Sequence, residues 1–137
     1  MRQDRGYVRR LFTVAGLLLA LCALPAADEL SPKQAAVAQF QQKLHDNDKG
    51  WLADHALYPL HYYGRRKLLI RNRKAFINDY ALLFGAKLRT AVLAQDPANV
   101  FENSQGLMIG EGLYNVWIRD IGDGDAARYQ IVAINGP

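Results

Sequence analysis

The sequence predicts an α+β fold. Apolar residues recur at helical spacing through most of residues 31–94, whereas short alternating segments separated by glycine-containing turns fill residues 100–134. One predicted strand pair, within residues 57–70, interrupts the helical part. Because the helices and strands are grouped and do not alternate one by one, we expect N-terminal helices packed on a mostly antiparallel sheet.

The first 27 residues have the pattern of an export signal. Four arginines form a basic start, an apolar run covers residues 11–24, and small residues lead to Ala27 and the acidic Asp28. The run is shorter than the roughly 20 residues that span a bilayer. We therefore expect a cleaved signal peptide over residues 1–27, a periplasmic or secreted domain over residues 28–137, and no stable membrane span after processing.

Two details leave the export route open. Arg9 and Arg10 are typical of a twin-arginine signal, but the leucine-rich run favours general secretion. Cys22 raises the question of lipid attachment, and Leu21 before it argues against acylation because that peptidase prefers a small residue.

Removal of this segment changes the charge and the cysteine content. The chain has 17 Lys+Arg and 13 Asp+Glu, and the segment holds four arginines and Asp4, which leaves 13 against 12. A nearly neutral domain is not expected to bind nucleic acid. The single cysteine, Cys22, also leaves, so neither a disulfide nor a thiolate ligand is expected.

A capping box predicts where the first helix begins. Ser31 is the expected cap, Pro32 the first helical residue, and Gln34 completes the box. Its buried stripe is expected to contain Val37, Phe40 and Leu44. Residues 46–50 should end it, and a shorter helix or turn should begin at Trp51.

A strand pair is expected next. Residues 57–63 alternate, which places Tyr58, Leu60 and Tyr62 on one face. Pro59 indicates one of two things. Either the segment is an edge strand, or Pro59 lies among the first residues of the strand. Residues 64–66 should turn the chain into a short return strand.

Helices and then strands follow. Asn72 is expected to cap a helix over residues 73–84 that Gly85 ends, and residues 86–94 form a further helix. Beyond Asp96-Pro97 we expect strands at residues 100–101, 106–109, 113–121 and 129–134, with turns at 110–112 and 122–125.

This order resembles the nuclear-transport-factor-2-like, or cone, superfamily. Residues 105–112, followed by Trp117 and the closing residues 131–135, look like a pattern in small exported bacterial members of unassigned function. The resemblance implies one cone-type domain, in which a curved, mostly antiparallel sheet wraps round the helices and leaves a pocket. It implies no single function, because the fold hosts isomerases, dehydratases, binding modules and immunity proteins.

The titratable residues give little support for catalysis. His45, His55 and His61 lack metal-ligand spacing, so no metal site and no cofactor are expected. Cone enzymes that resemble ketosteroid isomerases use a carboxylate base beside a tyrosine or an acid, and this chain could supply such groups from Asp54, Tyr58, His61 and Tyr62. The sheet half offers no inward carboxylate, so we expect no catalytic residues and keep a small isomerase or dehydratase as the alternative.

A basic cluster is the least ordinary feature of the expected domain. Its members are Arg65, Arg66, Lys67, Arg71, Arg73 and Lys74. Arg73 and Lys74 oppose the dipole of their helix, and neither has a carboxylate three or four residues on. The cluster is either a solvated face or a surface for an anionic partner.

Binding without catalysis is the function that we expect. Trp117 and Asn115 share a mixed strand face that suits a pocket or an interface. The expected ligand- or partner-binding residues are Tyr58, His61, Tyr62, Asn115 and Trp117. The partner is expected to be a protein or small ligand of the cell envelope, as for an immunity-type protein, and a homodimer through the sheet face is a further option.

Overall fold

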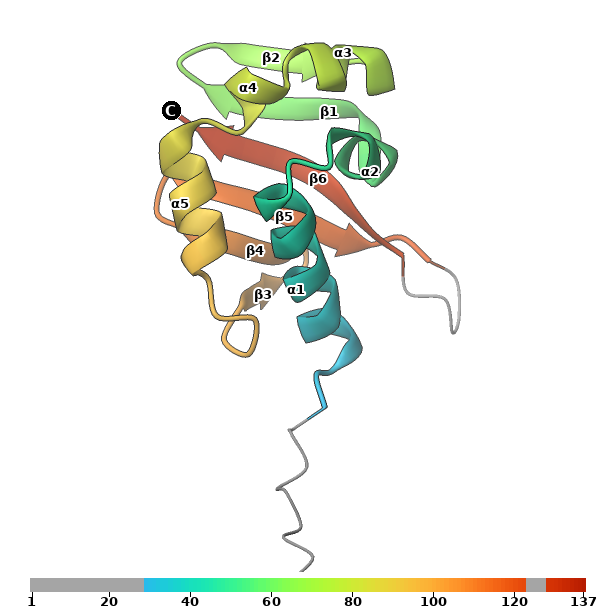
Figure 1. Cartoon of the computed structure of the whole chain (residues 1–137), viewed down its shortest axis with the longest axis vertical. Coiled ribbons are helices and arrows are strands. Elements are labelled where there is room, and N and C mark those ends of the chain that lie inside the picture. The colour runs from blue at the N-terminus through green and yellow to red at the C-terminus, as the bar shows by residue number, and fades with distance from the viewer. Residues whose placement is uncertain (1–28, 123–127) are drawn as a thin grey trace, which may run out of the picture.

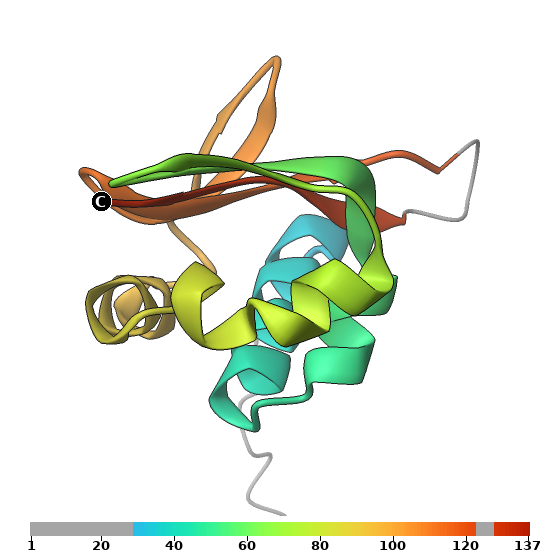
Figure 2. The same cartoon turned by 90° about the horizontal axis from the view of Figure 1, so that it is seen from above.

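In the computed structural model, the helices pack on one face of a mixed sheet (Figure 1), and Figure 2 shows them all on the same side of it. The structure describes residues 29–122 and 128–137. The expected signal peptide, its cleavage site and most of the turn expected at 122–125 lie outside these residues. The α+β class predicted from the sequence is confirmed.

The described residues form five helices and six strands. The helices are α1 (Pro32–His45), α2 (Lys49–Asp54), α3 (Arg73–Asn78), α4 (Tyr80–Leu83) and α5 (Ala86–Ala94). The strands are β1 (Ala56–Gly64), β2 (Lys67–Ile70), β3 (Phe101–Asn103), β4 (Gly106–Glu111), β5 (Tyr114–Asp120) and β6 (Tyr129–Gly136).

One parallel pair makes the sheet mixed. The strand order is β2-β1-β6-β5-β4-β3, and β1 and β6 run parallel, whereas the other neighbours among the described strands are antiparallel. The prediction of a mostly antiparallel sheet is therefore confirmed in its coarse form. The β1–β6 pair joins the hairpin of the N-terminal half to the C-terminal meander.

Strand β1 is not an edge strand, so the interpretation of Pro59 as a mark of an edge was wrong. The pairing with β6 passes from Ala56↔Ile131 directly to His61↔Ala133, and the pairing with β2 begins at Leu60. Pro59 lies in this interruption, where its missing N–H removes no ladder hydrogen bond.

The capping signals were predicted correctly. Ser31 accepts from the Gln34 N–H, the Gln34 side chain accepts in return from the Ser31 N–H, and Pro32 is the first residue of α1. Asn72 caps α3 by accepting from the Ala75 N–H at 2.9 Å. These local contacts set where both helices begin.

The helix predicted over residues 73–84 is broken at Asp79 into α3 and α4. Asp79 ends α3 and its carbonyl accepts from the N–H groups of Leu82 and Leu83. The break brings Phe84 to ring-centroid distances of 5.2–6.5 Å from Phe40, Phe76 and Tyr80. Packing of this aromatic group outweighs the local preference for one continuous helix.

A polar contact closes the end of α1. Arg89 on α5 donates to the Leu44 carbonyl at 2.9 Å and to Asn47 Oδ1 at 2.8 Å, and the Tyr80 hydroxyl donates to the same Asn47 oxygen. The Arg89 bond adds to the one that the Leu44 carbonyl accepts from the Asn47 N–H, so the last turn of α1 is held by both backbone and side-chain donors. These contacts also connect three helices over the core.

In the β4–β5 hairpin, the backbone at Gly110 leaves no room for a side chain, and this can be tested. Gly110 has a φ of +122°, and a Cβ there would overlap the Tyr114 carbonyl oxygen and lie 2.9 Å from the Asn115 Cα. Gly110→Ala should therefore lower the free energy of unfolding by about 2–4 kcal/mol in chemical denaturation. Gly112→Asn is the matched control, because Gly112 (φ +56°) has open space and asparagine tolerates this conformation. Equal losses of unfolding free energy in the two variants would show that Gly110 is not specially constrained by its backbone conformation and close contacts.

Candidate functional site

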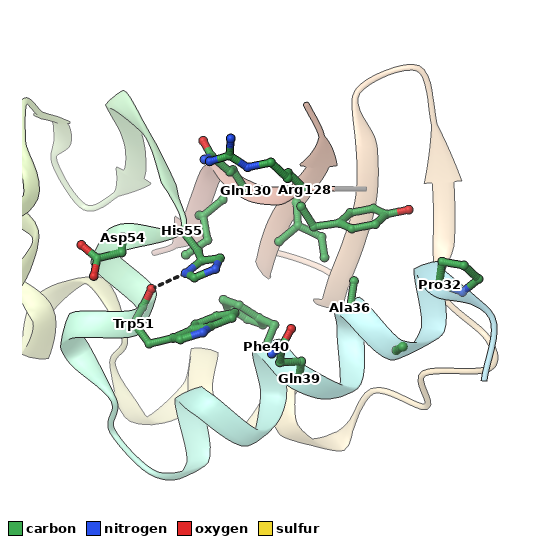
Figure 3. Close-up of a pocket in the computed structure, with 13 residues that line it drawn as sticks. Pro32, Ala36, Gln39, Phe40, Trp51, Asp54, His55, Arg128 and Gln130 are labelled. Atoms are coloured by element: carbon green, nitrogen blue, oxygen red, sulfur yellow. Dashed lines mark hydrogen bonds between the residues drawn. The ribbon is translucent and has the colours of Figure 1, made fainter. Parts of the chain in front are cut away.

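A cavity of about 610 Å³ lies between α1, α2 and the start of β6 (Figure 3). Its volume falls in the range of roughly 300–1,000 Å³ that is usual for small-molecule sites. The larger apolar side chains of its wall are Phe40, Trp51, Ile118 and Ile131. Polar groups from three segments face or border the same space.

His55 is held firmly at this cavity. It follows α2, and its carbonyl accepts from the Ile131 N–H at 2.7 Å, which joins it to the start of β6. Its ring stacks on Trp51 with centroids 3.7 Å apart and planes 13° apart. The ring position is therefore set by both a strand contact and an aromatic contact.

The hydrogen bond of His55 determines which ring nitrogen is free. Nδ1 lies 2.8 Å from the Trp51 carbonyl oxygen. Because a carbonyl only accepts, Nδ1 carries the proton in this contact, and the neutral ring presents Nε2 as an acceptor. The cavity thus contains a fixed histidine whose second nitrogen can accept a hydrogen bond or a proton.

Other polar side chains surround His55. Arg128 and Gln130 lie above its ring in Figure 3, and Gln39 lies on α1 across the cavity. The backbone at Arg128 is fixed because its N–H donates to Asp120 Oδ1 at 3.1 Å. A ligand here would meet amide groups, one guanidinium and one imidazole beside an aromatic wall.

Tyr129 adds a neutral hydroxyl to the lining. Burial raises the pKa of Tyr129 above its ordinary value, and the Asp120 carboxylate adds to this effect. The phenol therefore remains protonated at neutral pH.

Asp54 borders the cavity but is already engaged. Its Oδ1 accepts from Arg73 Nε at 2.7 Å, and in Figure 3 its carboxylate points away from His55. This ion pair connects α2 to α3. Asp54 therefore does not orient the imidazole.

The five predicted binding residues do not come together, and none lines the His55 cavity. Tyr58 and Tyr62 are on the helix-facing side of β1, where their hydroxyls donate to the Ala53 and Gly136 carbonyls, each at 2.7 Å. Both hydroxyls are thus engaged in hydrogen bonds to the backbone. The ring of Tyr62 lines a separate cavity.

The other three belong to the opposite face of the sheet. His61 stacks beside Tyr63 with centroids 5.9 Å apart, and Trp117 packs edge-on against Phe101 at 6.3 Å. Asn115 is buried, donates to the Gly112 carbonyl and accepts from Asn135 at 2.6 Å. Its polar atoms stabilise the hairpin and its neighbouring strand.

Sequence reasoning considered His55 as a metal ligand or a base and did not predict its position at this cavity. The spacing of Trp51 and His55 was the available signal, because residues four apart lie one above the other on a helical turn. Within the described residues, no group of three His, Cys, Asp or Glu side chains is placed to hold a metal ion.

The predicted basic cluster is divided between different environments. Arg65 and Arg66, in the turn between β1 and β2, line the separate cavity that also contains Tyr62. Arg73 pairs with Asp54. The remaining members, which are exposed and form no ion pair with a described residue, are Lys67, Arg71 and Lys74.

Comparison with known proteins provides no family for the chain. No protein-family model matches it, and comparisons with curated proteins and with solved structures find no match. None of the helices in residues 29–122 and 128–137 is long and apolar enough to cross a membrane.

Tyr58 should contribute to the pH dependence of the free energy of unfolding in the alkaline range. Burial, with a smaller effect of Asp54, raises its pKa from 10.0 to about 12. Between these values the folded state binds more protons than the unfolded state, so the contribution of Tyr58 to stability is complete below pH 10 and is lost as the pH rises to about 12. Tyr58→Phe should remove this component, so chemical denaturation should show a shallower decline across this range. If the free energy of unfolding declined equally in the parent protein and in Tyr58→Phe, the raised pKa of Tyr58 would be contradicted.

Arg73 and Lys74 should respond differently to neutralisation. Arg73→Gln removes an exposed ion pair and should lower the free energy of unfolding by about 0.2–1 kcal/mol, an effect that disappears in an Asp54→Asn background. Lys74→Gln removes a cation from the first turn of α3 and should leave stability unchanged or raise it by roughly a few tenths of a kcal/mol. A double-mutant cycle measures the coupling, and zero coupling would assign Arg73 to the solvated face.

Proposed function

We propose that the chain is an exported protein whose folded domain binds a small ligand beside His55 without catalysing a reaction. Residues 1–27 contain a basic start, then an apolar run, then small residues, and this order supports export to the periplasm or beyond. The observation that carries the binding proposal is the His55 cavity, where a fixed imidazole presents a free acceptor to about 610 Å³ of space.

We also propose that residues 28–137 form one domain of the cone type. In support, helices cover one face of a sheet in which a hairpin and a meander are joined by a central parallel pair. A cavity lies between α1 and this sheet, as the resemblance implies.

The lining indicates the chemistry of the ligand. Trp51 and Phe40 suit a flat or apolar body, His55 Nε2 accepts a hydrogen bond, and Arg128 suits a carboxylate or carbonyl oxygen. The ligand class that satisfies these groups together is a small aromatic acid or amide.

A protein partner is the second form of the binding proposal. Tyr63, Leu69 and Phe101 are 43%, 41% and 55% exposed on the sheet face opposite the helices. Exposed apolar residues on one face suit a protein interface, for a partner as in an immunity-type protein or for a homodimer.

An enzyme of the isomerase or dehydratase class is the competing function. His55 favours it, because Nε2 could take a proton from a substrate in the adjoining space. Against it, the described partner of Nδ1 is a backbone carbonyl and not a carboxylate, so no negative charge stabilises the imidazolium through that nitrogen. Binding therefore remains the preferred proposal.

The test uses His55→Asn, in which the asparagine N–H can replace Nδ1 at the Trp51 carbonyl while the Nε2 acceptor is lost. His61→Asn on the opposite face is the matched control. A library of small aromatic acids and amides is titrated into methyl-labelled protein, and we expect shifts at Ile118 and Ile131. His55→Asn should weaken the best compound by about tenfold and His61→Asn should not.

Three outcomes separate the functions. Compounds that shift no cavity methyl, or that bind His55→Asn with full affinity, contradict the ligand site. A compound that is chemically converted by the parent protein and not by His55→Asn establishes the enzyme instead. Co-purification of one stoichiometric protein that blocks the residues around Phe101 establishes the protein-partner form.

A further inference from the structure

A second cavity, of about 420 Å³, lies at the other end of β6 from His55. It is bounded by the β1–β2 turn, by α4 and α5, and by the last residues of β6. Its apolar wall includes Leu68, Leu82, Leu83 and Leu88, with the rings of Tyr62 and Tyr114. The Tyr62 hydroxyl donates to the Gly136 carbonyl, so this side chain offers the cavity mainly a hydrophobic surface.

Three cations share this apolar cavity. Arg65 and Arg66 come from the β1–β2 turn and Lys87 comes from α5, where its Nζ lies 6.0 Å from the centroid of the Tyr114 ring. Among the described residues that line the cavity none has an acidic side chain, and no ion pair joins these cations to a described carboxylate. Like charges that border one cavity repel one another, and a bound anion would relieve that repulsion.

Leu82 adds an exposed apolar surface to this cavity. It is 53% exposed at this cavity, whereas Leu83 beside it is fully buried. An apolar surface next to cations that form no ion pair with a described side chain suits a molecule that has both an apolar part and a negative charge. Neither a purely polar anion nor a neutral hydrocarbon would satisfy both features.

We propose that this cavity binds an amphipathic anion, a molecule with one carboxylate or phosphate head and an apolar tail. The tail lies against Leu68 and Leu82, and the head is held by Arg65 and Arg66, whose guanidinium groups can donate paired hydrogen bonds to either head group. The cations adjoin a cavity of limited volume, so the ligand is a single anion from solution and not a lipid within a bilayer. The proposal does not depend on His55 or on its cavity.

The probe is dodecanoate at concentrations below micelle formation, titrated by calorimetry into protein recovered from expression of the full chain. We expect one molecule to bind per chain, with affinity that falls as salt is added. Dodecyltrimethylammonium has the same tail with the opposite charge, and acetate has the head alone. Both should bind at least about tenfold more weakly, because each loses one of the two interactions.

A charge-matched pair of variants locates the head. Arg65→Gln with Arg66→Gln should weaken dodecanoate binding by about tenfold or more. Lys67→Gln with Lys74→Gln removes the same number of charges from residues that do not line the cavity, and should leave binding unchanged. Leu82→Ser alters an exposed position, so the fold should persist while the affinity for dodecanoate falls and the weak response to acetate stays the same.

Four results would overturn the proposal. Equal losses in the two double variants would show attraction to general surface charge, and equal binding of dodecyltrimethylammonium would show a purely apolar site. Unchanged dodecanoate affinity in Leu82→Ser would place the tail elsewhere. Binding to phosphatidylglycerol vesicles without binding to monomeric dodecanoate would identify a membrane surface instead.

Discussion

The parallel pairing of β1 with β6 is the contact on which the rest of the structure depends. It joins a hairpin from the first half of the domain to a meander from the second half, and no other described strand pair connects them. At one end of the seam the Ile131 N–H donates to the His55 carbonyl, and at the other end the Tyr62 hydroxyl donates to the Gly136 carbonyl. Each cavity lies at one of these two ends.

The two cavities use this common strand in different chemical ways. Beside His55 the polar groups are mainly neutral, and a hydrogen bond and a stacked ring fix the imidazole. At the opposite end the polar groups are cations on an apolar wall. Shape and hydrogen bonding dominate recognition in the first proposal, whereas charge and the hydrophobic effect dominate it in the second.

Local signals predicted much of the secondary structure, and long-range contacts explain most of the differences. The Ser31 capping box, the Asn72 cap and the buried faces of β1 and β5 depend on residues close in sequence. The position of β1 inside the sheet depends on β6, so Pro59 alone could not reveal it. The break at Asp79 depends on the packing of Phe84 with Phe40 on α1.

The candidate site was less predictable for the same reason. Tyr58, Tyr62 and Asn115 are polar residues near the expected pocket, but their hydrogen bonds are made with carbonyl and amide groups that lie elsewhere in the sequence or in a turn. Arg73 lacks a carboxylate within its own helix and finds Asp54 on α2. Sequence spacing can identify partners along one helix, but it cannot identify the ones that tertiary folding brings together.

The parallel seam also decides when the domain can finish folding. Its first paired residues, Ala56 and Ile131, are separated by 75 positions, so a large loop must close before the sheet is complete. For a chain exported unfolded by general secretion, one of the two routes considered above, β1 has no β6 neighbour until the last described strand arrives. A chain interrupted before β6 would leave two sheet fragments, β1–β2 and β3–β5, each with an unpaired edge open to aggregation. Completion of the sheet thus depends on the arrival of β6.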